Sequence, residues 1–332
     1  MKLNGKMFRH PMDNNRLDIV TSDKGSFVIF NTTDGANIAY QAKYQVDGIV
    51  ENMEFQLSKQ DYTTLSKLGE FDIAIDGPTL IVKAERFSAK FTKFDGVKLK
   101  LPDSKPQQLG INLSDIYEAA KFVSDKHINV MYHGVIISPD AIIGTDSYVM
   151  YRKEVNTNIS KAISVPPLIL KYLDKDKTYR CFLFGGKQIC FVSGEEAFFS
   201  NLYEGDYKDM AALFKRGGQV ISCSRAELMK SLAECAMFAS IVVLSASQDQ
   251  TLKIENLENE KGSKYTASIE CEEFQGIYKL NIGMLQQVIS ISQDEQIDIH
   301  VGNNRALVEY QNIKSLVTET QATRDGKKAG GK

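Results

Sequence analysis

One pattern occurs three times along this chain, at intervals of about 110 residues. Each time, a strand-like segment leads into a short helix-like segment and then into a hairpin with a glycine turn. The turns centre on Gly77, Gly185–Gly186 and Gly302. The repeat predicts three similar domains in a row. Such an architecture more often builds a shape than a single active site.

A second element recurs on the same spacing. The segments Leu113–His127 and Cys223–Ser240 are predicted amphipathic helices, N-capped by Ser114 and Ser224, with strand-like residues after each. Each copy therefore reads as two units of one strand, one helix and three strands, which predicts an α+β protein.

The predicted domains are residues 1–105, 106–219 and 220–322, followed by a polar tail, 323–332, that we expect to be disordered. The first copy has a clipped start. We expect its first strand to be missing and its first helix to be reduced or lost.

Two short motifs predict local pairing. A Thr-Asp turn occurs at 33–34 and again at 145–146. Gly185–Gly186 predicts a two-residue hairpin turn that places Cys181 opposite Cys190. The five cysteines have no metal-type spacing, so reduced thiols in a cytoplasmic protein are favoured over a Cys181–Cys190 disulfide.

The composition excludes several classes of protein. No run approaches the ~18 apolar residues that a membrane span needs, and the first residues lack the apolar core of a secretory signal. The 40 basic and 42 acidic side chains give a net charge of −2, which argues against a simple nucleic-acid binder. It leaves room for positive charge gathered on one surface.

The sequence contains no catalytic pattern. Its four histidines are scattered, and "FGGKQ" lacks the spacing and the ending of a phosphate loop. We therefore predict no enzymatic activity, no metal and no cofactor. An enzyme built on β-rich repeats is a minor alternative.

The order of the motifs carries a resemblance. The three-copy plan, the Thr-Asp turns, "FFSNLYEGDYKDM" and "RAELMKSLAECAMF" together resemble the bacterial DNA polymerase III beta sliding clamps, in divergent form. The resemblance implies a processivity factor for DNA replication, a homodimeric head-to-tail ring with helices lining the hole and sheets outside. The implied partners are double-stranded DNA, held without sequence preference, and a DNA polymerase and clamp loader that bind through short peptide motifs.

The resemblance also implies where DNA and a second copy would bind. For DNA we nominate basic residues on or next to the predicted helices: Lys59, Lys67, Lys121, Lys126, Lys171, Lys175, Arg225 and Lys230. For the dimer interface the nominated residues are Phe87 and Ala89 on one side and Met237 and Phe238 on the other.

A peptide-binding pocket is implied between the second and third copies. Its nominated residues are Tyr132, Thr145, Ser147, Tyr148, Met150, Gly205, Met210, Val308, Leu316 and Val317. In the first copy, Asn37 and Ala39 occupy the matching positions, and we expect no seam between copies there. The alternative for the pocket is that Tyr148 and Met150 only pack an interdomain seam.

The chain departs from the family at this pocket. Gly205 stands where proline is usual, Asp209 replaces a basic residue, and the C-terminal ending differs. We therefore expect the pocket either to be present with an altered peptide preference or to be absent. The alternative function for the whole chain is a clamp-fold adaptor or decoy that binds clamp partners without encircling DNA.

Overall fold

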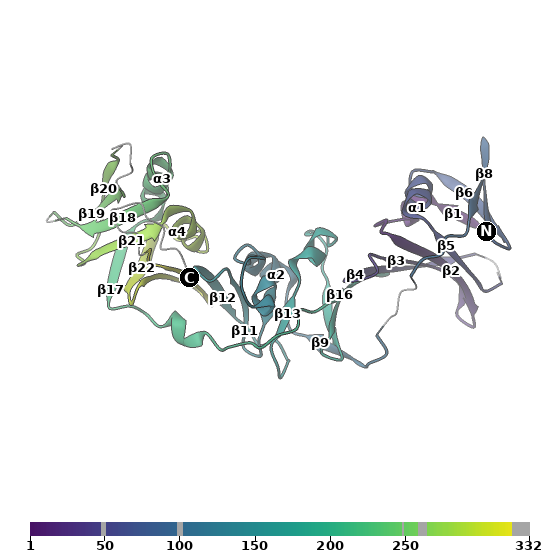
Figure 1. Cartoon of the computed structure of the whole chain (residues 1–332), viewed down its shortest axis with the longest axis horizontal. Coiled ribbons are helices and arrows are strands. Elements are labelled where there is room, and N and C mark those ends of the chain that lie inside the picture. The colour runs from purple at the N-terminus through teal and green to yellow at the C-terminus, as the bar shows by residue number, and fades with distance from the viewer. Residues whose placement is uncertain (48–50, 98–101, 248, 258–263, 321–332) are drawn as a thin grey trace. The chain divides into compact units, whose positions relative to one another are not determined.

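The structure is a computed structural model that describes residues 1–47, 51–97, 102–247, 249–257 and 264–320 (Figure 1). The chain divides into two compact units. The first contains residues 1–114 and 165–203, and the second contains residues 115–164 and those from 204 onward. The predicted tail, 323–332, lies outside the described residues.

The α+β prediction of three repeats, each made of two strand–helix–three-strand units, is confirmed. The first repeat contains β1 (Lys2–Asn4), the 3-10 helix η1 (Gly5–Met7), β2 (Asn14–Ser22), β3 (Gly25–Thr33), β4 (Ile38–Val46), β5 (Met53–Leu57), α1 (Lys59–Ser66), β6 (Glu70–Asp76), β7 (Thr79–Ala84) and β8 (Phe87–Thr92).

The second repeat contains β9 (Pro106–Leu109), α2 (Leu113–Ala120), η2 (Val130–His133), β10 (Val135–Ile137), β11 (Ala141–Thr145), β12 (Val149–Glu154), β13 (Ile163–Val165), η3 (Pro167–Lys171), β14 (Arg180–Phe184), β15 (Gln188–Ser193) and β16 (Glu196–Asn201).

The third contains β17 (Gln219–Ser224), α3 (Arg225–Ala236), β18 (Ile241–Ala246), β19 (Thr251–Asn256), β20 (Thr266–Glu270), β21 (Ile277–Asn281), α4 (Ile282–Ile289), β22 (Gln296–Gly302), β23 (Arg305–Tyr310) and β24 (Ile313–Thr318). The 3-10 helix η4 (Ala211–Phe214) precedes it.

The start of the first repeat is more complete than predicted. Its first strand is present as β1, which pairs with β6 and sets Leu3 opposite Phe71. Its first helix is reduced, as expected, to the single turn η1. Gly5 is required there because a Cβ would lie 2.1 Å from the Leu68 carbonyl oxygen at the end of α1.

The two predicted helices differ in outcome. Helix α3 has the predicted cap, since the Ser224 side chain accepts the Glu227 N–H, and its apolar stripe, which includes Leu228 and Leu232, is buried. Helix α2 ends at Ala120, seven residues before the predicted end, and Ser114 lies inside its first turn.

The Gly-Gly hairpin is one residue longer than predicted. Phe184 pairs with Gln188, so three residues form the turn, and Cys181 faces Phe191 while Phe182 faces Cys190. The predicted Cys181–Cys190 pairing is therefore wrong, because Lys187 joins the two left-handed glycines in the turn. Both cysteines are buried free thiols.

Strands from neighbouring repeats merge into shared sheets. The first unit holds the sheets β1-β6-β7-β8 and β5-β2-β3-β4-β16-β15-β14-β9. The second holds β13-β10-β11-β12-β24-β23-β22-β17 and β20-β19-β18-β21. In each eight-stranded sheet, half comes from one repeat and half from the next.

Within each unit the helices lie on one face of the sheets (Figure 1). Helix α4 contacts β12, β23 and β24, and so covers the junction between the second and third repeats. Helix α2 approaches β11 very closely at Gly144, where a Cβ would lie 1.9 Å from the Ala119 carbonyl oxygen.

Candidate functional site

The Thr-Asp motif forms the same turn in the first two repeats. The hydroxyl of each threonine, Thr33 or Thr145, donates to a backbone carbonyl, and the aspartate Oδ1 that follows accepts backbone N–H groups. Gly35 and Ser147 hold the left-handed position, with φ of 81° and 84°. The motif therefore sets the start of β4 and of β12.

Two of the same hydrogen bonds recur in the third repeat, between Asn256 at the end of β19 and Tyr265 just before β20, and the sequence did not reveal them. Asn256 Oδ1 accepts the Tyr265 N–H at 2.6 Å, and the Asn256 N–H donates to the Tyr265 carbonyl at 3.4 Å. The same two bonds join Asp34 with Ile38 and Asp146 with Val149.

The first and second repeats join through β4 and β16, which pair antiparallel with Ala39 opposite Phe199. The Asn201 N–H also donates to the Asn37 carbonyl, at 2.9 Å. Our prediction that Asn37 and Ala39 face no seam is therefore wrong. The strand after the Thr-Asp turn is a seam strand in both repeats.

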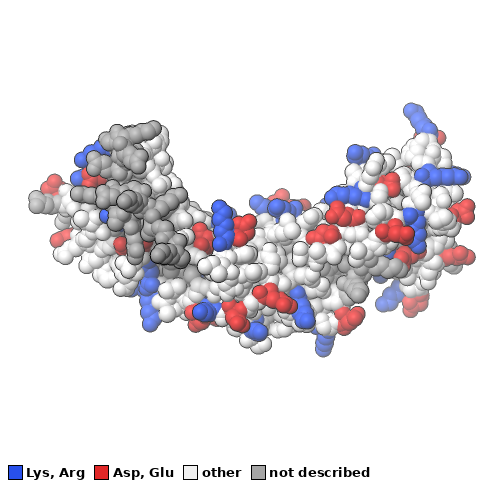
Figure 2. Space-filling view, viewed as in Figure 1, with Lys and Arg blue, Asp and Glu red and all other residues white. Residues whose placement is uncertain are grey.

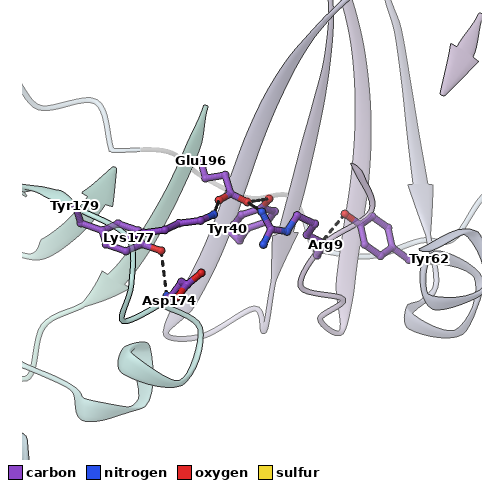
Figure 3. Close-up of polar contacts among 7 residues, drawn as sticks. All are labelled: Arg9, Tyr40, Tyr62, Asp174, Lys177, Tyr179 and Glu196. Carbon is purple, nitrogen blue, oxygen red and sulfur yellow. Dashed lines mark hydrogen bonds and ion pairs between the residues drawn. The ribbon is translucent and has the colours of Figure 1, made fainter. Parts of the chain in front are cut away.

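A buried carboxylate holds this first seam together (Figure 3). Glu196 of β16 accepts hydrogen bonds from Arg9 at 2.5 Å, Lys177 at 2.7 Å and the Tyr40 hydroxyl at 3.0 Å. Arg9 and Tyr40 come from the first repeat, and Lys177 from the second. Sequence reasoning missed this cluster because its members are far apart in the chain and form no motif.

The cluster sets the protonation of its members. Burial opposes ionisation of Glu196, but the hydrogen bonds from Lys177 and Tyr40 and the two positive charges outweigh burial and lower its pKa. Burial also lowers the pKa of His10, whose ring contacts Tyr40. The seam is therefore built for an ionised Glu196 and a neutral His10.

The second and third repeats join through β12 and β24, with Met150 opposite Leu316. On the sheet face away from α4, these residues belong to a cluster that we call the outer cluster. Its buried members are Tyr132, Ile136, Ala141, Ile143, Met150, Phe214, Leu307 and Leu316, with Ala162, Tyr207 and Met210 packed against them.

The outer cluster brings together four nominated pocket residues, Tyr132, Met150, Met210 and Leu316. A segment before η4 covers it: the Lys208 N–H donates to the Tyr132 hydroxyl at 3.2 Å, and Gly205 lies against Met131.

The other nominated residues lie elsewhere. Thr145 and Ser147 form the turn, and Tyr148 beside them is 62% exposed. Val308 and Val317 alternate with the outer-cluster leucines along their strands, so they lie on the opposite face, toward α4.

Arg152 of β12 lies beside the outer cluster. It shares the face of Met150, two residues away, and its Cα partner on β11 is Ile143. Its Nη2 donates to Asp140 at 2.5 Å, whereas its buried Nη1 has no hydrogen-bond partner among the described residues. A buried cationic donor is thus available next to the apolar cluster.

No protein-family model matches the sequence, and no curated protein matches it either. Solved structures do. The DNA polymerase III subunit beta from Pseudomonas aeruginosa is 16% identical with a TM-score of 0.79, over 97% of this chain and 100% of that one. The DNA polymerase sliding clamp from Caulobacter crescentus is 13% identical with a TM-score of 0.80, over 97% and 99%. This chain has the DNA sliding-clamp fold.

On this clamp fold, the nominated DNA-binding residues lie on or next to helices. All are exposed except Arg225, which is half-buried. Lys59 pairs with Asp13 at 3.2 Å and Lys121 with Glu118 at 2.6 Å, so part of their charge is balanced locally. Figure 2 shows basic and acidic side chains interspersed on the visible face of each unit.

Two of the strands that lie at the ends of sheets are near the nominated interface residues. Strand β8 is the last in β1-β6-β7-β8, and β20 ends the sheet β20-β19-β18-β21. Three of the four nominated interface residues lie in or beside these strands. Phe87 and Ala89 are in β8, and Phe238 stacks on Tyr265 just before β20, with ring centroids 5.8 Å apart. Met237 is 75% exposed.

Within the described ranges, no group of three or more His, Cys, Asp or Glu side chains could hold a metal ion. In the same residues no helix is long and apolar enough to cross a membrane.

Proposed function

We propose that this protein is a DNA sliding clamp: a non-enzymatic, head-to-tail ring of two copies that encircles duplex DNA and tethers a replicative polymerase. One observation carries the proposal. Each internal seam joins the last strand of one repeat to the strand after the polar turn of another. Among the described residues, one strand of each kind, β8 and β20, has no pairing strand on one side.

A second copy supplies what each of these edges lacks. Unpaired edge strands are a liability in a soluble protein unless something covers them. A heterologous contact that closes gives a ring, and two chains of three repeats give six repeats. The β8 edge of each copy would therefore meet the β20 edge of the other copy, which gives two equal seams.

The basic residues of the helices would hold the DNA. Nonspecific attraction to phosphates is long-ranged and weakens with salt, and it allows sliding because it reads no bases. We assign this role to the eight nominated residues, Lys59, Lys67, Lys121, Lys126, Lys171, Lys175, Arg225 and Lys230.

We assign partner binding to the outer cluster and to Tyr148. Short peptides from a polymerase or a clamp loader bind clefts through a few apolar anchors, and the outer cluster supplies leucine, methionine and aromatic side chains at one site. A peptide would have to displace the segment that carries Tyr207 and Met210.

The test is topological. Loaded onto nicked circular DNA by a clamp loader, the protein should stay bound and should slide off once the circle is cut. Its native mass should be twice 37.1 kDa. A native mass of 37.1 kDa, or equal retention on linear and circular DNA, would contradict the proposal.

A further inference from the structure

Two cysteines of the third repeat face each other across a short antiparallel pairing. Cys223 is in β17, and Cys271, the residue after β20, forms an isolated β-bridge with it. Next to this pair, the Glu272 N–H donates to the Ser222 carbonyl at 3.1 Å. The chain that leaves β20 therefore runs antiparallel beside β17, with the two cysteines directly opposite each other.

The two cysteines form the closer type of antiparallel pair. The Arg225 N–H donates to the Glu295 carbonyl on the β22 side, so two residues earlier the Cys223 N–H and carbonyl also point toward β22. The Cys271 N–H likewise donates away from its opposite cysteine, to the Gln250 carbonyl at 3.1 Å. Pairs that exchange no backbone hydrogen bonds have Cα atoms about 4.5 Å apart, which is within the range of about 4.4–6.8 Å found in disulfides.

A small molecule can reach this pair. Both thiols are free, and both line a cavity of about 850 Å³ beside the start of α3. Cys223 is 2% exposed, whereas Cys271 is half-buried. A molecule in the cavity therefore meets the Cys271 sulfur first.

The chemistry of the thiols keeps them reduced until an oxidant is concentrated beside them. Burial, the nearby Cys271 and acidic neighbours raise the pKa of Cys223 to about 12. Burial also raises the pKa of Cys271. Because the thiolate is the form that attacks a disulfide, these thiols react slowly at neutral pH, and the local concentration of the oxidant decides the rate.

The charge of the cavity determines which oxidants gather there. Its lining includes five acidic side chains, and among the described residues that line it there is no lysine or arginine. The acidic residues are Glu227, Asp249, Glu270, Glu272 and Glu273. A cavity lined by one sign of charge concentrates small ions of the opposite sign. A positively charged disulfide is therefore attracted to the pair, and a negatively charged one is repelled.

We propose that Cys223 and Cys271 are a redox modification site, which forms an intramolecular disulfide by exchange with a positively charged, low-molecular-weight disulfide. The Cys271 thiolate attacks one sulfur of the oxidant, which forms a mixed disulfide and releases the first thiol. Cys223 then attacks the Cys271 sulfur, which forms the protein disulfide and releases the second thiol. Two protein thiols are oxidised, the oxidant is reduced to two thiols, and the two protons pass to these leaving groups.

The new bond connects two sheets of the second unit. Strand β17 ends the eight-stranded sheet, and β20 ends the four-stranded sheet. In the reduced protein, backbone contacts such as the Glu272 hydrogen bond hold the chain after β20 against β17. A covalent link at Cys271 suppresses local opening of this contact.

Oxidation of the reduced, full-length protein with cystamine, a disulfide that carries two positive charges, tests the proposal. After denaturation and alkylation, peptide mass spectrometry should show Cys223 joined to Cys271. Cys181 and Cys190 are the matched control, because they lie on paired strands but point to opposite faces and should stay thiols. Absence of the Cys223–Cys271 bond, or adducts that remain on the separate cysteines, would overturn the proposal.

Single variants test the order of the steps. In Cys223→Ser the mixed disulfide should accumulate on Cys271, because no second thiol can displace it. In Cys271→Ser the buried Cys223 should stay unmodified over the same time. Faster modification of Cys223 than of Cys271 would show that the assigned order is wrong.

A comparison of oxidants tests the role of the acidic lining. At low salt, cystamine should form the bond about tenfold faster or more than oxidised glutathione, which is negatively charged, after each rate is divided by the rate with the urea-unfolded chain. The difference should shrink at ~0.5 M salt, where charges are screened. Equal normalised rates at low salt would refute the charge preference.

Amide hydrogen exchange measures the structural effect. Oxidation should slow exchange in the peptide that contains Cys271 and Glu272 about tenfold, and dithiothreitol should restore the original rate. Peptides of β2 and β3, in the first unit, are the control and should not change. The same exchange before and after oxidation would show that the bond does not hold the two sheets together.

Discussion

Replacing Glu196 should loosen the first seam selectively. This carboxylate is the shared partner of Arg9, Lys177 and Tyr40. The substitution Glu196→Ala leaves these three side chains without their shared hydrogen-bond acceptor. Glu196→Gln keeps an oxygen that can accept the Tyr40 hydroxyl and removes only the charge.

The expected loss of stability depends on how exposed the partners of Glu196 are. Removing one partner of a buried ion pair costs about 3–5 kcal/mol. The Arg9 and Lys177 side chains are 40% and 34% exposed, so water rehydrates them, and we reduce that figure to about 2 kcal/mol. The buried Tyr40 hydroxyl, left unpaired, adds about 1 kcal/mol. We expect about 3 kcal/mol for Glu196→Ala and about 2 kcal/mol for Glu196→Gln.

Amide hydrogen exchange read by mass spectrometry resolves the seam from the rest of the chain. Peptides of β4 and β16 should exchange about 100-fold faster in Glu196→Ala, whereas β22 and β23 should not change. Glu195→Gln is the matched control, since Glu195 is the exposed neighbour in the turn. Equal exchange in Glu196→Ala and Glu195→Gln, or equal effects of the Ala and Gln variants at residue 196, would refute this reasoning.

Three other perturbations have defined outcomes. Gly144→Ala should lower the free energy of unfolding by about 1–3 kcal/mol or more in urea titrations, because its Cβ meets the backbone of α2. The pKa of His10 is lowered in the fold, so its contribution is present above pH ~6.5 and lost as pH falls through the folded pKa; His10→Asn should flatten the stability between pH 7 and 5. Lys121→Glu with Lys171→Glu should weaken DNA binding and reduce its salt dependence by about two ion equivalents, read from binding at several salt concentrations.

The sequence predicts the repeat well because the interactions that define the repeat join residues close together in the chain. The Ser224 cap and the Thr-Asp turns involve neighbours within five residues, so their patterns are visible in one pass. The equivalent bonds in the third repeat were missed because Asn256 replaces aspartate and its partner, Tyr265, lies nine residues away.

Contacts between residues far apart in the chain could not be predicted from the sequence. Arg9 and Glu196 are 187 residues apart, and no sequence motif indicates that they are in contact. The nominated pocket residues Val308 and Val317 lie on the sheet face opposite to the outer cluster, for a different reason. Adjacent strand residues point to opposite faces, so a one-residue uncertainty in alignment exchanges a cluster residue for one under α4.

The middle repeat is divided between the two compact units. The boundaries of the compact units therefore lie about half a repeat away from the boundaries of the repeats. A fragment cut at the repeat boundaries would keep β12 and β16 with no strand beyond them, and would tend to aggregate. Adding or removing a whole repeat, in contrast, leaves the same complementary pair of ends. The ends of such a chain are therefore independent of its length, which makes the number of repeats per subunit free to vary while the joints stay the same.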